Sequence, residues 1–567
     1  PLSHAINRMR LGYLSSAGGR LAESKFHLSH LFYMDDLKIY SSSAEGLEQV
    51  LSRVASVSGS ISMLVNTAKC AKASHLPSRL GAQATEEEAE SETPDIRSLT
   101  IGESYKYLGI EQRLGIKPSQ AWHRARDKFV GAVERVWSLD LTLRQKISFT
   151  NALLPIVTYV VRNSFKGGGT FRSTLKRGDE LDVQVRKILV RQHARYKASS
   201  VDRLYLPASL GGYGLLSVRD SLAEAAVYAW AYVSTKADLR KQLSLFQALA
   251  RRGKRCILTD AQTALEETGC AATTDSQRSV VLFNHKEYDS PRELARAVTS
   301  AMRESRNTCR TGAWKSLSSA GKVLHSDIDI ETSFLWLKAG KMSAVVARNA
   351  LAAQEGCLLT RASPGSGSID KSCRRCKSSW ETPEHVATHC SMWLPTLYVY
   401  RHDTVAQRMH YQLCRMAGLK APQYSQSVPG IMSNDRYKLC WNQPVQCNAV
   451  IRHNKPDMVL YDLQQKTALV VEIAISWHTR LEQQRQLKLN RYTVNGNIDD
   501  VATPYPRGDN LIGDLGSQGW KCSFLPVVIG ACGEIRSELP AELASIGLPE
   551  LGTADCIERM SRSAVLG

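Results

Sequence analysis

Residues 30–40, His-Leu-Phe-Tyr-Met-Asp-Asp-Leu-Lys-Ile-Tyr, place two adjacent carboxylates between two short apolar runs. The runs are rich in aromatic and branched side chains, so they predict the strands of a hairpin with Asp35 and Asp36 at its tip. Carboxylates held at such a tip can bind hard divalent cations, which in turn hold phosphate oxygens. The alternative is an ordinary solvated Asp-Asp turn.

This segment also resembles a known family. Tyr-Met-Asp-Asp at 33–36 is similar to the signature tetrapeptide of reverse transcriptase palms. Residues 63–70, Met-Leu-Val-Asn-Thr-Ala-Lys-Cys, resemble the next palm motif, in which a lysine faces the incoming triphosphate. The resemblance implies that Lys69 acts as a general acid toward the pyrophosphate leaving group, and an ordinary surface lysine is the alternative.

Residues 105–110, Tyr-Lys-Tyr-Leu-Gly-Ile, resemble the primer grip of the same family. The resemblance implies that Tyr107 and Gly109 lie against a primer's sugar-phosphate, because glycine permits a tight hairpin there. An acidic run at 86–94, between the two palm-like segments, predicts a solvated loop.

Lys and Arg outnumber Asp and Glu by 73 to 54, for a formal charge of +19. Such an excess suits a polyanionic partner, and nucleic acid is the default, although membranes and ribosomes also attract basic proteins. Residues 118–200 are helical by periodicity and rich in Arg and Lys. The resemblance implies a thumb here, whose cationic helices follow a duplex backbone, and a charged solvated helix face is the alternative. Residues 203–214 resemble a loop of the same retroelement proteins, and 216–350 read as mostly helical.

The 14 cysteines are scattered apart from one close group, and no secretory apolar segment is present. This usage indicates a reducing compartment and argues against a disulfide scaffold. The longest apolar stretch, 149–161, is interrupted by Asn151 and Pro155 and is too short to span a bilayer.

The close group has the spacing C-x2-C-x8-H-x4-C and is formed by Cys373, Cys376, His385 and Cys390. These ligands can close a tetrahedron around Zn²⁺, with the first pair on a tight knuckle and the last pair about one helical turn apart. His389 competes with Cys390 or His385 for the fourth place, and a chance grouping of four free residues is the other alternative. A knuckle beside Arg374 and Arg375 predicts structural zinc that presents basic side chains to nucleic acid.

Two segments around this group extend the family resemblance. Residues 352–361, Ala-Ala-Gln-Glu-Gly-Cys-Leu-Leu-Thr-Arg, and 400–403, Tyr-Arg-His-Asp, resemble the linker region of non-LTR retrotransposon proteins of the restriction-like-endonuclease class. Cys357 lies outside the ligand spacing and is expected to be a small core residue.

A second candidate catalytic site follows. Residues 455–461 and 468–475 predict two strands joined by a turn at 462–466. Such a hairpin brings Asp457 and Glu472 together, and two carboxylates so placed can chelate Mg²⁺ and activate a water for phosphodiester cleavage. Pro-Asp, 14 residues and then Glu resembles the PD-(D/E)xK nuclease core. An ordinary half-buried hairpin with exposed acids is the alternative.

One departure from that core concerns its lysine. Ala474 occupies the position where the usual lysine stands. In the retrotransposon version, a lysine on the following helix takes over, and the expected helix at 479–492 offers Lys488, with Arg491 and Tyr492 on the same face. Lys488 is therefore expected to orient the attacking water or stabilise the phosphorane. Arg491 occupies the place where relatives carry another lysine.

The resemblance covers nearly the whole chain and is to LINE-like, target-primed reverse transcriptases with a restriction-like endonuclease. The expected fold class is multidomain α+β, with a partial reverse transcriptase palm, a helical thumb and linker, a zinc knuckle and an α/β restriction-like endonuclease. The expected domains are the palm part at 1–115, the thumb at 116–215, a helical linker at 216–350, the zinc-knuckle region at 351–405, the endonuclease at 406–545 and a C-terminal tail at 546–567.

In such proteins the nuclease nicks DNA, and the freed 3′-hydroxyl primes copying of the element's RNA. The resemblance implies element RNA, target DNA and, for a complete palm, deoxynucleoside triphosphates as partners, without a membrane. It also implies Mg²⁺ or Mn²⁺ and Zn²⁺ as cofactors, and the nucleus as location. The chain starts at Pro1, which indicates a truncation. The family's earlier palm carboxylate is therefore expected before Pro1, and this chain alone is not expected to polymerise DNA. A decayed or host-retained protein that only binds nucleic acid is the competing hypothesis.

Overall fold

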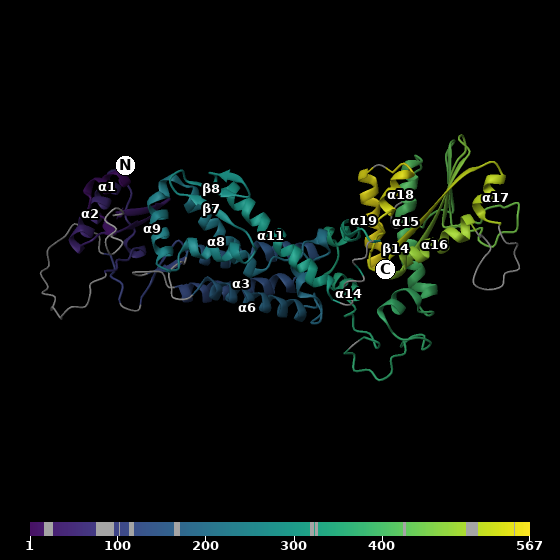
Figure 1. Ribbon diagram of the computed structural model, residues 1–567, viewed down its shortest axis with the longest axis horizontal. Helices are drawn as coiled ribbons and strands as arrows, with labels where there is room; N and C mark the ends of the chain where they lie inside the picture. The colour runs from purple at the N-terminus through teal and green to yellow at the C-terminus, as the bar shows by residue number, and fades with distance from the viewer. Residues whose placement is uncertain are drawn as a thin grey trace. The chain divides into compact units, whose positions relative to one another are not determined.

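The computed structural model describes residues 1–15, 26–74, 96–100, 103–112, 118–163, 170–317, 323, 327–363, 365–422, 427–494, 509–548 and 550–567. The chain mixes helices with several small sheets and divides into two compact units (Figure 1). The first unit comprises Pro1–Ala132, Leu153–Gln184 and Ser217–Arg306, and the second Val133–Ala152, Val185–Leu216 and Asn307–Gly567. The mixed class agrees with the sequence, whereas the six-domain division stays a prediction. The acidic run at 86–94 lies outside the described residues.

The first unit contains most of the palm-like and thumb-like segments. Its elements, three of which (α3, α6 and α11) continue into the second unit, are α1 Leu2–Met9, β1 Tyr13–Ser15, β2 Phe26–Leu28, β3 His30–Tyr33, β4 Asp36–Ile39, α2 Ala44–Ser60, η1 Thr67–Lys69, β5 Tyr105–Tyr107, β6 Ile110–Gln112, α3 Pro118–Ser138, α5 Pro155–Asn163, α6 Phe171–Arg191, α8 Val218–Thr235, η3 Ala237–Leu239, α9 Arg240–Arg251, α10 Ile257–Glu266, β7 Ala272–Asp275, β8 Val280–Phe283, β9 Lys286–Tyr288 and α11 Pro291–Lys315.

A three-stranded antiparallel sheet, β7-β8-β9, interrupts the segment expected to be mostly helical. Its second turn is built by Asn284 and His285, which both have positive φ, 47° and 62°. Asparagine and histidine adopt this left-handed region more readily than most side chains, so the pair permits a tight connection. Its short strands are too weak a signal to separate from their helical surroundings by sequence.

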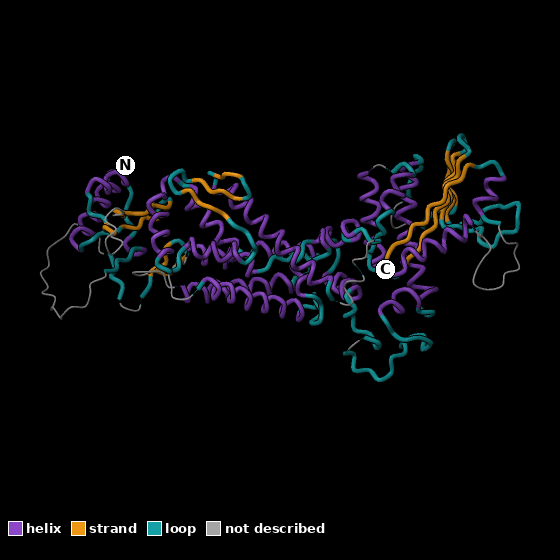
Figure 2. The backbone as a smooth tube through the Cα atoms, viewed as in Figure 1, coloured by secondary structure: helices purple, strands orange, loops and turns teal. Residues whose placement is uncertain are grey.

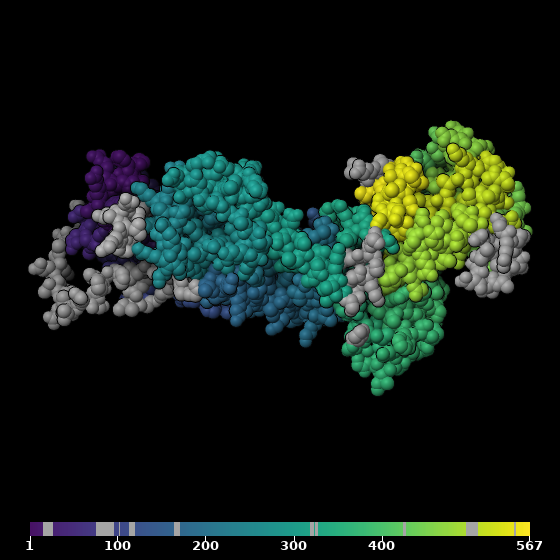
Figure 3. Space-filling model, in the orientation of Figure 1, coloured from purple at the N-terminus to yellow at the C-terminus, as the bar shows by residue number. Residues whose placement is uncertain are grey.

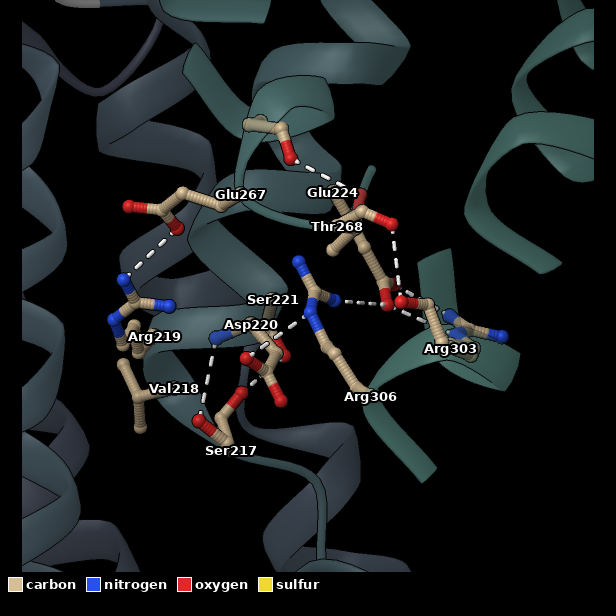
Figure 4. Close-up of polar contacts among 12 residues, drawn as sticks. Ser217, Val218, Arg219, Asp220, Ser221, Glu224, Glu267, Thr268, Arg303 and Arg306 are labelled. Carbon is tan, nitrogen blue, oxygen red and sulfur yellow. Dashed lines mark hydrogen bonds and ion pairs between the residues drawn. The ribbon is translucent and has the colours of Figure 1, made fainter. Parts of the chain in front are cut away.

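Ion pairs join the helices of the same unit. Arg306 of α11 lies 3.4 Å from carboxylate oxygens of both Asp220 and Glu224 on α8. Arg303, one turn earlier, also pairs with Glu224, at 2.5 Å (Figure 4). The side chains of Arg306 and its two partners are only 11–13% exposed, so water screens these pairs poorly. These basic residues therefore stabilise helix packing and are already neutralised within the fold.

The second unit carries the zinc-knuckle and nuclease segments. Its elements are α4 Leu143–Ala152, α7 Val201–Tyr205, η2 Ala208–Leu210, α12 Ile330–Ser333, α13 Leu335–Ala339, α14 Ala344–Gln354, η5 His385–His389, η6 Leu394–Tyr398, α15 Val399–Met416, β10 Ile431–Ser433, β11 Tyr437–Trp441, β12 Met458–Asp462, β13 Thr467–Ser476, η7 His478–Arg480, α16 Leu481–Leu489, η8 Asn490–Val494, α17 Leu511–Ser517, β14 Lys521–Gly530, α18 Leu539–Ser545 and α19 Glu550–Leu566.

A five-stranded sheet in the order β10-β11-β12-β13-β14 forms the centre of this unit (Figure 2). All neighbours are antiparallel except β13 and β14, which pair in parallel from Thr467↔Lys521 to Ser476↔Gly530. β13 is apolar at nearly every position and is buried from Val470 onward, as expected for a central strand covered on both faces. α15 packs on β13 and α19, whereas α16 and α17 pack on β14. Glu472 is the only charged residue of β13.

Arg203 of α7 is a fully buried cation of this unit, and its side chain is only 1% exposed. Its Nε donates to the carbonyl of Gly211 at 2.8 Å, and its Nη1 lies 3.3 Å from Glu355 Oε1. Its guanidinium also lies 4.5 Å from the ring centre of Trp314. The segment at 203–214, which resembles a retroelement loop, is thus tied to α14 by a buried ion pair.

Within the part of the chain that the structure describes, no helix combines the length and the apolar character needed to cross a bilayer.

Candidate nuclease site and metal centre

The β12–β13 hairpin brings the two predicted nuclease acids together. Met458 pairs with Val471, so Asp457, just before β12, stands opposite Glu472. The backbone N–H of Asp457 donates to Glu472 Oε2 at 3.1 Å, and the N–H of Ile473 donates to Asp457 Oδ2 at 2.7 Å. Each carboxylate is therefore bonded by the backbone of the other strand. Glu472 is buried and Asp457 is half-buried, so the two acids are linked within the hairpin rather than freely exposed.

Lys488, the predicted replacement lysine, reaches the same point from α16. Its Nζ lies 2.6 Å from Glu472 Oε1, and the two side chains are 16% and 9% exposed. Ala474 is buried in a small apolar cluster with Leu481 and Val528. The position of the usual lysine is thus part of the core, and the helix supplies the cation instead.

The helix itself differs somewhat from the expectation for 479–492. α16 begins at Leu481 after the 3₁₀ turn η7, and its last turn widens into the π-helical segment η8. Tyr492 does not lie on an open face with Lys488, because it is buried and stacks on Phe524 with ring centres 5.2 Å apart. Its hydroxyl hydrogen-bonds Glu472 from within the core, and burial raises its pKa strongly.

His402 is a site residue that the sequence did not single out, although it stands in the segment 400–403. Its Nε2 lies 3.3 Å from Asp457 Oδ2 and 3.3 Å from the carbonyl oxygen of Ile473, and its Nδ1 lies 3.0 Å from Asp403 Oδ1. Burial lowers the pKa of His402, but its hydrogen bonds to Asp403 and Asp457 outweigh burial and raise that pKa to about 10. The Tyr-Arg-His-Asp string was the only signal in the sequence that pointed to it.

The two acids differ in electrostatic environment. Burial raises the pKa of Glu472, and the nearby Lys488 opposes this only in part. Burial also acts to raise the pKa of Asp457, but the hydrogen bond with His402 prevails and holds that pKa below its usual range. Such separation of two neighbouring carboxylates is typical of sites with distinct chemical roles. Carboxylate oxygens are the ligands that Mg²⁺ and Mn²⁺ prefer, so the donor set fits either ion.

Four soft or borderline ligands form a second cluster. The ligand atoms of Cys373, Cys376, His385 and Cys390 all lie within 4.8 Å of one another. The Sγ atoms of Cys373 and Cys390 are 3.9 Å apart, and Cys376 Sγ is 3.3 Å from His385 Nε2. A tetrahedron with usual zinc bond lengths has S···S edges of about 3.8 Å and S···N edges of about 3.5 Å. The two printed separations lie near these values, and the cluster could therefore bind zinc.

The fourth ligand, which the sequence left open, is Cys390 in this grouping. His389 is turned to Thr388, whose Oγ1 lies 2.6 Å from His389 Nδ1. η5 is π-helical, and the hydrogen bonds of a π-helix join residues five apart. His385 and Cys390 are five residues apart, so this wider turn lets both side chains face one centre. A hydrogen bond from the Ser378 hydroxyl lowers the pKa of Cys376 to about 6, which favours the thiolate that metals bind.

The two arginines of the knuckle have different surroundings. Arg374 donates through Nε, Nη2 and its backbone N–H to Glu381, and the arginine lowers the pKa of that glutamate to about 2. Arg375 instead lies 4.9 Å from the ring centre of Trp393. Arg374 is thus already used in holding the knuckle, and Arg375 fits the predicted nucleic-acid contact better. Cys357, the expected core residue, is only half-buried, with Sγ 3.3 Å from Ser199 Oγ.

The zinc-ligand segment lies against the nuclease elements of the same unit. Arg401 of α15 donates to the carbonyl of Ala387, within η5, at 2.9 Å. Arg480, between β13 and α16, pairs with Glu384 at 2.9 Å. In the space-filling view this segment forms the green surface lobe beside the lime-coloured residues of α16 (Figure 3). The two candidate sites therefore share structural supports.

The palm-like residues also gather, within the first unit. β3 and β4 form the predicted hairpin, with Asp35 in its turn and Asp36 at the start of β4, both exposed. The Tyr107 hydroxyl lies 3.5 Å from the carbonyl oxygen of Asp36, and the Tyr105 hydroxyl donates to the carbonyl of Lys69 at 2.6 Å. The acid pair, the lysine segment and the primer-grip-like hairpin are thus neighbours.

The primer-grip-like segment is the tight hairpin that its glycine predicted. β5 and β6 pair through Tyr107↔Ile110, and Leu108 and Gly109 between them have φ of 47° and 80°. A two-residue turn with both φ positive matches the twist of the strands, and glycine takes this conformation without strain.

Several cations of 118–200 have partners inside the fold. Arg195 is buried and donates to the carbonyl of Ser199. Arg124 and Arg191 pair with Glu111 and Glu134. α3, α4, α5 and α6 confirm that the described part of this segment is mostly helical, but part of its charge is structural.

No protein-family model matches the chain, and no curated protein sequence matches it.

Proposed function

We propose that the second unit is a divalent-metal-dependent DNA endonuclease of the restriction-like class, belonging to a retrotransposon reverse transcriptase. The observation that carries the proposal is the meeting of Asp457, Glu472 and Lys488 at one end of the β12–β13 hairpin. Two oxygen ligands and a cation at one point can together serve metal-assisted phosphodiester hydrolysis. The resemblance of the motif order to LINE-like proteins supplies the class of substrate.

Each side chain has a distinct role in this proposal. Asp457 and Glu472 hold the ion, which when bound supplies an activated water and neutralises charge on the phosphate. Lys488 places a positive group beside Glu472 and, with substrate bound, stabilises the charge that develops on the phosphorane. The low exposure of Glu472 and Lys488 strengthens these interactions, because little water competes for them.

Plasmid nicking tests the proposal. The unaltered protein should convert supercoiled plasmid to open circles with Mg²⁺ or Mn²⁺ and not with a chelator present. Asp457→Ala and Glu472→Ala each remove a metal ligand, so nicking should fall by orders of magnitude while DNA binding persists. Asp435→Ala is the matched control, because Asp435 is an exposed carboxylate in the turn between β10 and β11 of the same sheet. Equal nicking by Asp457→Ala and the control would reduce the hairpin to a structural element.

A second candidate function is nucleic-acid binding through a zinc knuckle without cleavage. The Cys373, Cys376, His385 and Cys390 cluster supports it, together with the adjacent Arg375. Under this alternative, the protein binds one Zn²⁺ and binds DNA or RNA, but no divalent ion induces nicking. Removal of zinc would then abolish binding, whereas Asp457→Ala would change nothing.

The first unit is proposed to be part of the polymerase, with Asp35 and Asp36 as its metal ligands, Lys69 as general acid, and Tyr107 and Gly109 against the primer. The support is the proximity of their hairpins and the sequence resemblance. Element RNA, target DNA and deoxynucleoside triphosphates are the corresponding partners, and the nucleus is the corresponding location. If nucleic acid is the partner, binding should weaken steeply as the salt concentration rises. On duplex DNA, the logarithm of the affinity should fall by about 0.9 per phosphate contact for each log unit of salt.

A further inference from the structure

The segment that follows the zinc ligands packs directly on the candidate nuclease strands. Tyr398, the last residue of η6, donates its hydroxyl to the carbonyl of Ile475 at 3.1 Å. One turn later, on α15, His402 reaches Asp457 and the carbonyl of Ile473. The rings of Tyr398 and His402 are nearly parallel, with centres 6.5 Å apart. These residues therefore form a support for β13 and for Asp457 that comes from outside the hairpin.

The contact of His402 with Asp457 falls on one oxygen. Oδ2 of Asp457 accepts from Ile473 N–H at 2.7 Å and lies 3.3 Å from His402 Nε2. A backbone hydrogen bond and a histidine ion-pair contact thus converge on the same oxygen, and His402 Nε2 also lies 3.3 Å from the Ile473 carbonyl oxygen. Both described contacts of the Asp457 carboxylate fall on Oδ2, so Oδ1 is the oxygen that a cation would bind.

His402 is itself held in place. Its Nδ1 lies 3.0 Å from Asp403 Oδ1, and its side chain is only 18% exposed. The neighbouring Arg401 donates to the Ala387 carbonyl, between two zinc-cluster residues in the chain, at 2.9 Å. The first turn of α15 is thus anchored on one side by the zinc-ligand segment and contacts the nuclease acids on the other.

We propose that His402 is a positioning residue of the nuclease site, which holds Asp457 through Nε2 so that its free oxygen meets the divalent cation. This inference rests on the proposed endonuclease function, because it assigns Asp457 as a metal ligand. Side chains that orient a metal ligand typically change metal affinity or activity by about 10–100-fold when removed. His402 touches Asp457 rather than the reacting atoms, so its effect should be on metal binding first.

A pair of substitutions isolates the Nε2 contact. His402→Gln places an amide donor near the position of Nε2 and keeps the reach to Asp457. His402→Asn places its amide near Nδ1, so it keeps the contact with Asp403 and loses the contact with Asp457. Tyr400→Phe is the control on the same helix, since Tyr400 is 65% exposed. Each protein is prepared with zinc, its zinc content is measured, and Mn²⁺ binding is titrated by calorimetry without DNA.

The expected result is Mn²⁺ affinity about tenfold weaker in His402→Asn, with His402→Gln close to the parent and zinc content unchanged in both. A merely structural role predicts that Asn and Gln weaken Mn²⁺ binding alike, and that result would overturn the proposal. So would parent-like affinity in His402→Asn. If the parent binds Mn²⁺ but never nicks DNA, the endonuclease proposal fails while the Asn and Gln comparison still decides the role of His402. If the parent binds no Mn²⁺, both fail.

Discussion

Replacing Lys488 with Met separates the replacement lysine from the two acids. Methionine keeps the length and much of the volume of lysine and removes only its charge, so the change should leave the packing of α16 in place. Glu472 then loses the charge-assisted hydrogen bond at 2.6 Å to Lys488 Nζ. The nicking rate of the proposed endonuclease should fall, because it would lose the positive group beside the scissile phosphate.

The size of the effect follows from the site. The side chains of Lys488 and Glu472 are 16% and 9% exposed, so solvent screens the pair weakly. At an effective dielectric constant of about 20, opposite charges at this separation attract by about 6 kcal/mol, and desolvation of both groups cancels much of it. A hydrogen bond to a charged group retains about 1.5–3 kcal/mol of stability. Loss of a preorganised donor to the transition state costs about 10²–10³ in rate, or about 2.7–4 kcal/mol.

The assay is single-turnover nicking of supercoiled plasmid at saturating Mg²⁺, well below the unfolding temperature of the variant. Lys488→Met should nick about 10²–10³-fold more slowly than the parent, and Lys488→Arg should fall between them because it keeps the charge but not the shape. Lys521→Met is the control, since Lys521 is an exposed lysine at the start of β14. If Lys488→Met nicks at the parent's rate while Asp457→Ala does not nick, the acids stand and the role given to Lys488 is refuted.

Three further predictions concern the metal cluster and the fold. Cys390→Ser should lose the single tightly bound Zn²⁺ expected of the purified protein, whereas His389→Ala should keep it, and elemental analysis decides between them. Arg203→Met leaves Glu355 buried without its cation, so it should lower the free energy of unfolding by about 3–5 kcal/mol. Denaturant titrations that follow the second unit measure this change, and a value below about 1 kcal/mol would contradict the reasoning. Arg374 bonds the charged form of Glu381 and lowers the pKa of this carboxyl to about 2 in the folded protein. The parent should therefore gain most stability over Glu381→Gln above pH about 4.5, and this gain should vanish as pH falls toward 2. Thermal unfolding midpoints of the two proteins, measured across this pH range, test the prediction.

The sequence was most informative where a site is local in the chain. The zinc ligands lie within 18 consecutive residues, and the acids Asp457 and Glu472 lie on adjacent strands of one hairpin. Spacing therefore predicted that these groups meet, although it left the fourth zinc ligand open. Lys488 could be assigned because the family resemblance implies a lysine on the helix after the hairpin, and Lys488 is the lysine that this helix offers.

Contacts between distant elements could not be predicted in this way. His402 meets Asp457 only because α15 packs on β13, and no local pattern encodes that packing. The same holds for Arg203, whose sequence surroundings indicated a loop motif, while its burial against Glu355 depends on α14. Arg374 was predicted to contact nucleic acid, and nothing in the sequence indicated that Glu381 folds back and pairs with it.

The most direct test of the account is the chemistry of the nick. In the proposed endonuclease, water activated at the site of Asp457 and Glu472 would attack phosphorus and release the 3′ oxygen, which would leave a 3′-hydroxyl and a 5′-phosphate. The protein should therefore convert supercoiled plasmid with Mg²⁺ into open circles that an added DNA polymerase extends from the nick, and Asp457→Ala should produce none. Nicks that end in 3′-phosphate, or extendable nicks formed equally by Asp457→Ala, would contradict the proposed endonuclease.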